Sequence, residues 1–564
     1  MAISLFLMYE GVFSMKGAEI VIETLIEQGT EVIYGYPGGQ VVDIYEALYS
    51  RGDRIKHILT AHEQGAAHAA DGYARATGKV GVVLATSGPG ATNLVTGIAN
   101  AYLDSVPMVA ITGNVPTDMM GKDGFQEVDI AGITMPIVKH NYIVHDIAKL
   151  ADIIREAFQI AKSGRPGPVL VDVPKNIQLM DYPYEKKEVV EPYKFAEANA
   201  EYIEDAIKII NSAKKPYIYI GGGVISAGVS DLVEELAEII DAPIGSSMMG
   251  LSAISYDNRR FLGMTGMHGR YAATAVKSRA DVIIALGTRF SDRAVSNSEH
   301  LKDTKIIHVD IDAAEIDKNI KSYIGIIGDL KSILESFNSK VKSVKHPKWM
   351  AEVEDVKNYA RENTPEQKGK LTPQEIIECV NKFTADDTPI VTDVGQHQMW
   401  VAQMYNFKKP RTFISSGGLG TMGFGLGAAI GSVMSTGKRA VLFTGDGSLG
   451  MNLTELATAV TNELPIVIVL MNNGVLGMVR QMQTLFKDKH YSHTTLNRKS
   501  DFVKIAEGFG AKGYRAEDVK ELENALKDAF ASDGVSLIEC TIDLDELVLP
   551  MIPSNGKFKD VILK

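Results

Sequence analysis

The chain has 564 residues, too many for a single hydrophobic core, which predicts about three domains. Its hydrophobic content of 45% and charged content of 23% are those of an ordinary globular protein, and it contains no apolar run that could span a membrane. The net charge of −12 argues against nucleic acid as the main partner, because phosphate binding needs a basic surface.

The N-terminal segment and the cysteines bear on location. Residues 1–14 are expected to be a tail, and their apolar run 5–9 lacks a preceding Lys or Arg and stops at Glu10, which makes a poor signal peptide. The two cysteines, Cys379 and Cys540, are far apart and have no metal-ligand spacing. They favour a reducing compartment, so we expect a cytoplasmic protein.

The first block, residues 15–185, alternates buried-strand candidates with helix-length segments. The first helix is expected to start at Met15, and the strand candidates are 31–34, 80–85, 108–111 and 169–173. This alternation predicts a parallel, doubly wound sheet. Residues 182–187 have no helical period and are interpreted as a linker.

Two further blocks repeat the pattern. Block 196–345 has strand candidates at 217–220, 282–286 and 306–310, and the Lys- and Glu-rich stretch 340–370 is interpreted as a second connector. The third block covers 371–564. The predicted fold class is therefore α/β, with three doubly wound parallel-sheet domains.

The third block carries the strongest chemical signal. Asp446, between Gly445 and Gly447, follows one strand candidate, and Asn473 follows the next. Parallel strands would bring both side chains to the sheet edge where α/β proteins bind ligands. Carboxylate and amide oxygens suit Mg²⁺, and flanking glycines let a diphosphate approach the backbone. Alone, Gly-Asp-Gly is more often a turn. The spacing resembles the motif of thiamine-diphosphate (ThDP) enzymes.

Glu63 lies at the start of an Ala-rich helix candidate, after His62. A glutamate there could simply be favoured by the helix dipole. ThDP, however, needs a carboxyl group that hydrogen-bonds its aminopyrimidine ring, so that the ring can act as the base for the reactive carbon. If the chain binds ThDP, Glu63 fits that role.

From Met15 onward the chain resembles the acetohydroxyacid synthase family, also called acetolactate synthase, whose members bind ThDP, Mg²⁺ and FAD. Several motifs in order carry the resemblance, together with the Asp446 and Asn473 motif: 35–39, 62–64, 86–90, 125–127, 164–168, 289–293, 395–398 and 417–423.

For ThDP, the resemblance implies a homodimer in which Glu63 reaches the coenzyme held by the other subunit's third block. Met422 would wedge between the coenzyme rings, although a Met there could also fill a core. Mg²⁺ would be held by Asp446, Asn473 and Val475. The remaining ThDP contacts implied are Gly395, Gln396, His397, Gly420, Gly445, Gly447, Ser448, Gly477 and Met478.

The second block would hold FAD. Its glycine runs alone are weak support, because tight strand-to-helix turns need glycine in any case. The segment 289–293 resembles the flavin-containing members rather than the flavin-free catabolic acetolactate synthases. The implied contacts are Arg165, Gly221, Gly222, Gly223, Gly266, His268, Gly287, Thr288, Arg289, Asp310, Ile311 and Asp329.

The implied reaction condenses two pyruvates to 2-acetolactate and CO₂, or pyruvate and 2-ketobutyrate to 2-aceto-2-hydroxybutyrate, in branched-chain amino-acid synthesis. Phe125, Gln126 and Lys175 match active-site positions, although Lys175 could simply be solvated. Arg293 could bind the acceptor carboxylate through its planar fork, or pair with Asp292.

One position departs from the family pattern. Met482 stands where most members have a Trp that contacts the acceptor, which puts strong 2-ketobutyrate preference in doubt. The resemblance also suggests a tetramer and a small regulatory subunit. Three alternatives remain: a pyruvate-oxidase-type oxidoreductase, a catabolic acetolactate synthase and a non-enzymatic assembly partner.

Overall fold

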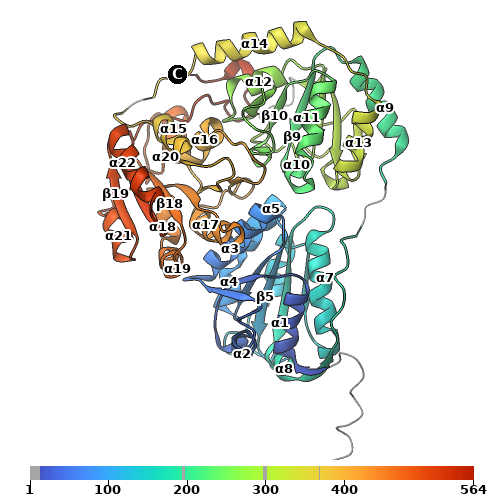
Figure 1. Ribbon diagram of the computed structural model, residues 1–564, viewed down its shortest axis with the longest axis vertical. Coiled ribbons are helices and arrows are strands. Elements are labelled where there is room, and N and C mark those ends of the chain that lie inside the picture. Colours follow the sequence, from blue (N-terminus) through green and yellow to red (C-terminus); the bar gives the residue numbers. More distant parts are fainter. Residues whose placement is uncertain (1–12, 194–196, 296–300, 368, 564) are drawn as a thin grey trace, which may run out of the picture.

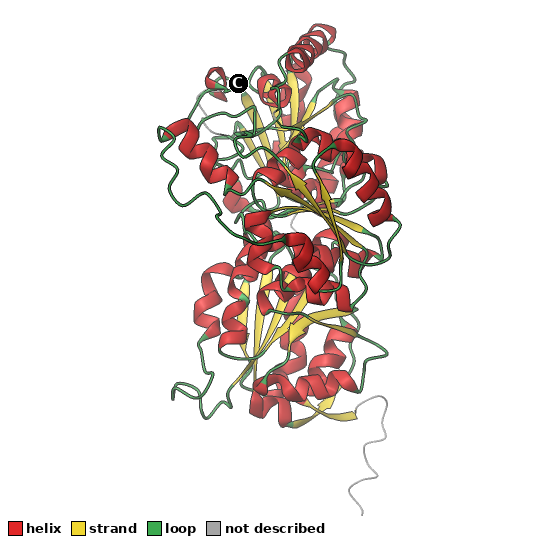
Figure 2. Cartoon of the chain, turned by 90° about the vertical axis from the view of Figure 1, so that its left-hand side faces the viewer, coloured by secondary structure: helices red, strands yellow, loops and turns green. Residues whose placement is uncertain are grey.

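The computed structural model describes residues 13–193, 197–295, 301–367 and 369–563. The three blocks each form one six-stranded parallel sheet covered by helices, which confirms the predicted fold class. Figure 1 shows the first domain in blue and cyan, the second in green and yellow, and the third in orange and red. Figure 2, turned by 90°, shows the sheets as yellow layers between red helices.

The first sheet has the strand order β3-β2-β4-β5-β7-β6. Strands β4, β5 and β7 are buried along their whole length, as expected for parallel strands with both faces covered. The strands are β2 (Val32–Tyr36), β3 (Lys56–Leu59), β4 (Gly81–Ala85), β5 (Met108–Asn114), β6 (His140–Ile143) and β7 (Pro168–Pro174). The helices are α1 (Gly17–Glu27), α2 (Val42–Tyr49), α3 (Glu63–Thr77), α4 (Pro89–Asn93), α5 (Val95–Asp104), α6 (Ile130–Thr134), α7 (Leu150–Lys162) and α8 (Lys175–Leu179).

The second sheet has the order β11-β10-β9-β12-β13-β14. Its strands are β9 (Pro216–Ile220), β10 (Ile244–Ser246), β11 (Phe261–Met264), β12 (Val282–Leu286), β13 (Lys305–Asp310) and β14 (Ile324–Ile327). Its helices are α9 (Ala200–Ser212), α10 (Gly222–Ala227), α11 (Ser230–Ile239), α12 (Tyr271–Lys277) and α13 (Leu330–Lys340).

The third sheet has the order β16-β15-β17-β18-β20-β19. Its strands are β15 (Ile390–Thr392), β16 (Phe413–Ile414), β17 (Ala440–Gly445), β18 (Ile466–Asn472), β19 (Lys512–Ala516) and β20 (Ser536–Thr541). Its helices are α15 (Pro373–Phe383), α16 (Gln396–Met404), α17 (Phe424–Thr436), α18 (Asp446–Asn452), α19 (Glu455–Thr461), α20 (Gly477–Phe486), α21 (Phe502–Gly508) and α22 (Val519–Phe530).

Two expectations at the borders of the first block are wrong. The first helix begins at Gly17 rather than Met15, because Met15 and Lys16 belong to strand β1 (Phe13–Lys16). β1 pairs antiparallel with β8 (Asp181–Tyr184), so the beginning of the segment interpreted as a linker is a strand. This two-stranded ladder ties the start of the first domain to its end.

The second connector contains a long helix, α14 (Pro347–Glu362). It lies along the outside of the molecule in Figure 1 and buries Trp349, Val353 and Val356. The indole N–H of Trp349 donates to the carbonyl of Pro216 at 3.0 Å, which fixes the helix to the second sheet.

The first and third domains meet through α3 and α17. A Cβ on Gly72 would lie 2.2 Å from the carbonyl oxygen of Ala428, and one on Gly431 would lie 1.9 Å from that of Ala69. Only glycine permits so close a backbone approach. The two helices lie side by side at the junction in Figure 1, so α3 is held firmly against the third domain.

Candidate functional site

All three sheets have a point where the strand order reverses, and the predicted site residues gather there. The reversals lie between β2 and β4, between β9 and β12, and between β15 and β17. Loops that leave such neighbouring strands turn to opposite faces and leave a crevice at the carboxyl edge, where open α/β sheets bind ligands.

In the third domain the residues predicted for the diphosphate and metal converge at this crevice. Gln396 begins α16 after β15, Asp446 begins α18 after β17, and Asn473 follows β18. The Asn473 side-chain amide donates to Oε1 of Gln396 at 3.2 Å. A Cβ on Gly477 would lie 1.9 Å from the same Oε1, so a larger residue there would have to displace the Gln396 side chain.

The buried polar groups of this crevice fit a bound diphosphate and cation. Burial lowers the pKa of His397 to about 3, which keeps its imidazole neutral, and its Nε2 has no hydrogen-bond partner among the described residues. Burial raises the pKa of Asp446 to about 6, and a nearby cation would favour the carboxylate. The hydroxyl of Ser448 donates to the Val394 carbonyl at 2.6 Å, so it would have to turn from this carbonyl to donate to a diphosphate.

A metal here would use few carboxylates. No group of three or more His, Cys, Asp or Glu side chains in the described ranges is arranged to hold an ion. The predicted Mg²⁺ ligands include only one carboxylate, that of Asp446. The others are the Asn473 side-chain amide and the Val475 backbone. The Val475 N–H donates to Oδ1 of Asn473 at 3.2 Å, so these two residues form one compact turn.

Met422 lies beside the same crevice. Its terminal methyl carbon is 3.5 Å from where a Cβ on Gly447 would be. The turn that carries it has Gly420 and Gly423 at φ of 70° and 88°, a region that favours glycine. The N–H of Gly423 donates to Oδ1 of the buried Asp393 at 2.8 Å, so the turn is tied to the end of β15.

Glu63 is the first residue of α3, as the sequence predicted, with His62 as the N-cap. Its Oε2 accepts from the Asn93 side chain at 3.0 Å. Its Oε1 faces Gly90, where a Cβ would lie only 3.2 Å away. The carboxyl group is thus oriented at the carboxyl edge of the first sheet, beside a glycine that leaves room for a ring.

The other first-domain residues lie around that edge. Lys175 pairs with Asp43 at 2.5 Å and donates to the Gly39 carbonyl at 3.1 Å, so it is partnered rather than simply solvated. Gln126 has a φ of 61°, and its backbone closes over Gly88. The Phe125 side chain is 85% exposed.

A cavity of about 580 Å³ lies between the three domains and collects most of the predicted flavin contacts. It is bordered by the loops after β9 and β12. Its predicted lining residues are Arg165, Gly222, Gly223, His268, Gly287, Thr288, Arg289, Asp310, Ile311 and Asp329. Gly221 and Gly266 do not line it; they pack against the backbone of Gly287 and Arg293, so their predicted flavin contact stays a prediction.

The cavity has polar groups that a ligand could satisfy. Burial and the charge of Arg293 lower the pKa of His268 to about 4, and its Nε2 has no partner within the described part of the chain. Burial raises the pKa of Asp310 to about 6. The cavity volume lies within the range of small-molecule sites. The unpartnered Nε2 of His268 and the close-packed glycines after β9 and β12 fit a nucleotide cofactor such as FAD.

The same cavity also reaches residues predicted for ThDP and the acceptor. Gly420, Met478 and Met482 line it together with Arg293. Arg293 lies 3.3 Å from Asp292, so the ion pair considered as the alternative is present, but both side chains are largely exposed. Exposed pairs hold weakly, so Arg293 can exchange Asp292 for a ligand carboxylate.

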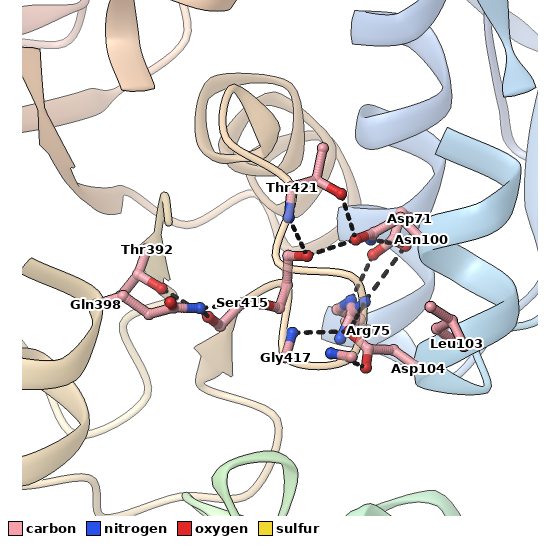
Figure 3. Close-up of polar contacts among 12 residues, drawn as sticks. Asp71, Arg75, Asn100, Leu103, Asp104, Thr392, Gln398, Ser415, Gly417 and Thr421 are labelled. Carbon is pink, nitrogen blue, oxygen red and sulfur yellow. Dashed lines mark hydrogen bonds and ion pairs between the residues drawn. The ribbon is translucent and has the colours of Figure 1, made fainter. Parts of the chain in front are cut away.

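Buried groups that the sequence did not predict hold these parts together. Glu455 on α19 accepts from the N–H groups of Ala61 and His62, at 3.2 and 3.0 Å, and so fixes the loop that ends at Glu63. Figure 3 shows a second group, in which Asp71, Arg75, Asn100 and Asp104 of the first domain meet the loop 415–421. These are isolated polar residues within helices, and no local pattern marks them.

Three family models match consecutive parts of the chain. They are the thiamine pyrophosphate enzyme N-terminal TPP binding domain over residues 15–133, the central domain over 203–337 and the C-terminal TPP binding domain over 393–540. Individual proteins match the chain over almost its whole length. The acetolactate synthase large subunit of Haemophilus influenzae is 42% identical over 97% of this chain and 98% of its own length.

Two Escherichia coli proteins match equally well. The isozyme 3 large subunit of acetolactate synthase is 42% identical over 97% of this chain and 98% of its own length, and the isozyme 1 large subunit is 43% identical over 97% of each. The chain belongs to the acetolactate synthase large-subunit family. This confirms the resemblance found in the sequence. In the described part of this acetolactate synthase family member, no helix has the length and hydrophobicity needed to cross a membrane.

Proposed function

We propose that this protein is an acetolactate synthase that joins two 2-keto acids with loss of CO₂, using ThDP, Mg²⁺ and FAD. Pyruvate is the donor, and pyruvate or 2-ketobutyrate is the acceptor, in branched-chain amino-acid synthesis. The observation that carries the proposal is the convergence of Gln396, His397, Asp446 and Asn473 at the carboxyl edge of the third sheet, where the buried Nε2 of His397 has no partner among the described residues.

The residues have distinct roles in this proposal. Bound ThDP supplies the carbanion-stabilising chemistry that removes CO₂ from one keto acid. Asp446, Asn473 and the Val475 carbonyl would hold the cation, and Met422 would contact the coenzyme. Glu63 hydrogen-bonds the pyrimidine ring. Arg293 binds the acceptor carboxylate, and Met482 contacts the acceptor side chain.

We further propose that two copies of the chain assemble each site. Within one chain Glu63 lies on the first domain's edge and is not among the residues that line the central cavity. Apolar side chains stand exposed near it, with Leu59 at 55% and Phe125 at 85%. On the third domain Met451, on α18, is 59% exposed. Burying these two faces against each other in a homodimer would bring Glu63 to a partner's coenzyme.

A tetramer, a small regulatory subunit and a cytoplasmic location belong to the same proposal. The large-subunit relatives support a catalytic subunit with a smaller companion. Cys379 and Cys540 are both buried and free, which supports a reducing compartment.

The deciding experiment is an assay of purified protein. We expect pyruvate alone to give 2-acetolactate and added 2-ketobutyrate to give 2-aceto-2-hydroxybutyrate, with activity that depends on ThDP, Mg²⁺ and FAD. Absence of both products in the presence of all three cofactors would refute the proposal.

The flavin is expected to stay oxidised during turnover. The condensation transfers no net electrons, so FAD should bind in the central cavity without net reduction while acetolactate forms. Anaerobic visible spectra recorded during turnover check this. Bleaching at the rate of product formation would instead indicate the pyruvate-oxidase type of reaction.

Met482→Trp is expected to raise the ratio of acetohydroxybutyrate to acetolactate. Met482 lines the cavity with Arg293, and a broad, rigid Trp face can contact the extra methylene of 2-ketobutyrate better than a flexible Met. One methylene in an apolar pocket is worth about 1–3 kcal/mol, or about 10–200-fold. Competition assays with both acceptors measure the ratio. An unchanged product ratio would show that Met482 does not contact the acceptor.

A further inference from the structure

The turn that carries Met422 is held from outside its own domain. The N–H groups of Gly417 and Gly418 both donate to the carboxylate of Asp104, at 2.9 and 2.7 Å. Asp104 is the last residue of α5 in the first domain, and its side chain has no solvent exposure. One buried carboxylate of the first domain thus accepts from two consecutive backbone amides of the third.

A second side chain holds the other end of the turn. Oδ1 of Asn100, one helical turn before Asp104, accepts from the hydroxyls of Ser416 and Thr421 at 2.5 and 3.2 Å. The Ser416 hydroxyl oxygen in turn accepts from the Thr421 N–H at 2.9 Å, which closes the loop on itself. Figure 3 shows these contacts between the blue helices and the tan loop.

An ion-pair network fixes the two holding side chains. Arg75 donates to Asp104 at 2.9 Å and also bonds Asp71, which accepts from the Asn100 amide at 3.0 Å. The side chains of Asp71 and Arg75 are almost fully buried. Charge-assisted hydrogen bonds between buried groups are stronger and more directional than neutral ones, so the network keeps Asp104 and Asn100 in one orientation.

We propose that Asp104 and Asn100 are positioning residues that fix the 416–423 turn, and with it Gly420 and Met422, for coenzyme binding. The turn is rich in glycine and two of its residues have positive φ, so its order depends on contacts from outside it. Asp393 holds its end at Gly423, whereas Asp104 and Asn100 hold Ser416, Gly417, Gly418 and Thr421. The inference rests on the proposed function. It adds that the first domain, besides presenting Glu63 at its edge, shapes the coenzyme site of its own chain's third domain.

Asp104 also adjoins the central cavity. It lines that cavity, and the guanidinium of Arg289, a predicted flavin contact, lies 4.0 Å from its carboxylate. Arg289 further donates to the Leu103 carbonyl at 2.5 Å. The carboxylate that orders the coenzyme turn therefore forms part of the wall of the flavin cavity.

The test uses Asp104→Asn in the full-length protein. An amide can accept only one of the two backbone N–H groups and turns its own N–H towards the other, so the turn should loosen. We expect faster hydrogen exchange across 416–423 before any coenzyme is added, and ThDP binding weakened about 10- to 150-fold, the range for loss of a hydrogen bond to a charged group. The pyruvate KM should change much less.

Asp241→Asn is the matched control. Asp241 is also buried, pairs with Arg260 at 2.8 Å and accepts the His346 N–H at 2.7 Å, but it lies in the second domain away from the turn. We expect this variant to lose stability without faster exchange at 416–423 or weaker ThDP binding. Ser416→Ala, a small change that removes the hydroxyl linking Asn100 and Thr421, provides a second variant if Asp104→Asn does not fold.

The outcomes separate the two proposals. Unchanged exchange across 416–423 in Asp104→Asn, or in Ser416→Ala where the first does not fold, would overturn the inference, as would an equal loss of ThDP binding in Asp241→Asn. If the wild type binds no ThDP while the turn still loosens in Asp104→Asn, the proposed function fails but the structural role of the network holds.

Discussion

Glu63→Gln is expected to slow turnover about 10²–10⁴-fold, the range for a positioned acid–base group, while ThDP and Mg²⁺ still bind. The amide keeps the shape of the side chain and can still bond Asn93, which now lies 3.0 Å from the carboxylate. It cannot carry the negative charge that favours the reactive tautomer of the coenzyme. Steady-state rates and ThDP titrations of both proteins provide the measurement.

Glu354→Gln is a suitable control for that prediction. Glu354 pairs with Lys357 at 2.6 Å on the outer helix α14 and is half exposed, so its loss should leave turnover unchanged. Near wild-type turnover in Glu63→Gln would show that Glu63 does not have the proposed catalytic role.

Asp446→Ala is expected to abolish tight binding of ThDP with Mg²⁺. Substitution of residues that merely support a ligand commonly costs about 10–100-fold in metal affinity, so loss of the one carboxylate ligand should exceed that. Calorimetric titration of ThDP at fixed Mg²⁺ measures the effect, and retention of ThDP independent of metal would contradict the assignment.

Asp518→Ala controls for removal of an aspartate at a helix start in the same domain. Asp518 caps α22 by accepting the Glu521 N–H at 2.9 Å. Its loss should cost about 1 kcal/mol of unfolding free energy, as for other N-caps, and leave ThDP binding intact.

The sequence predicted the central strands well because parallel strands covered on both faces are continuous β-branched runs. The expected 282–286 strand coincides with β12, and the expected 108–111 strand lies within β5. Short strands at the sheet edges were not predicted. β16, for example, has only two residues, Phe413–Ile414, which is too few to show a sequence pattern. β8 contains Pro183 and pairs with a partner far away in the sequence, so local signals could not reveal it.

The helix α14 was hidden by its composition. Its buried residues Trp349, Val353 and Val356 follow helical spacing, but the Lys- and Glu-rich background led us to interpret the stretch as a connector. The spacing i, i+4, i+7 was the available signal.

The site was predicted unevenly. Asp446 and Glu63 were singled out, the first by its flanking glycines after a strand candidate and the second by the carboxyl group that ThDP requires, and their roles stay predictions. Asp104 and Glu455 were not, because their partners lie more than 300 residues away in the sequence. A buried carboxylate in a helix has no signature of its own, and only the packing of the domains gives it a role.

The ladder between β1 and β8 has a consequence for how such proteins can evolve. Ser14 pairs with Pro183 and Lys16 with Asp181, so the chain enters and leaves the first domain through adjacent strands. A domain whose two ends lie together can be joined to another chain at a single point. Residues 13–184 therefore form a unit suited to recombination, one that could be transferred whole to another chain.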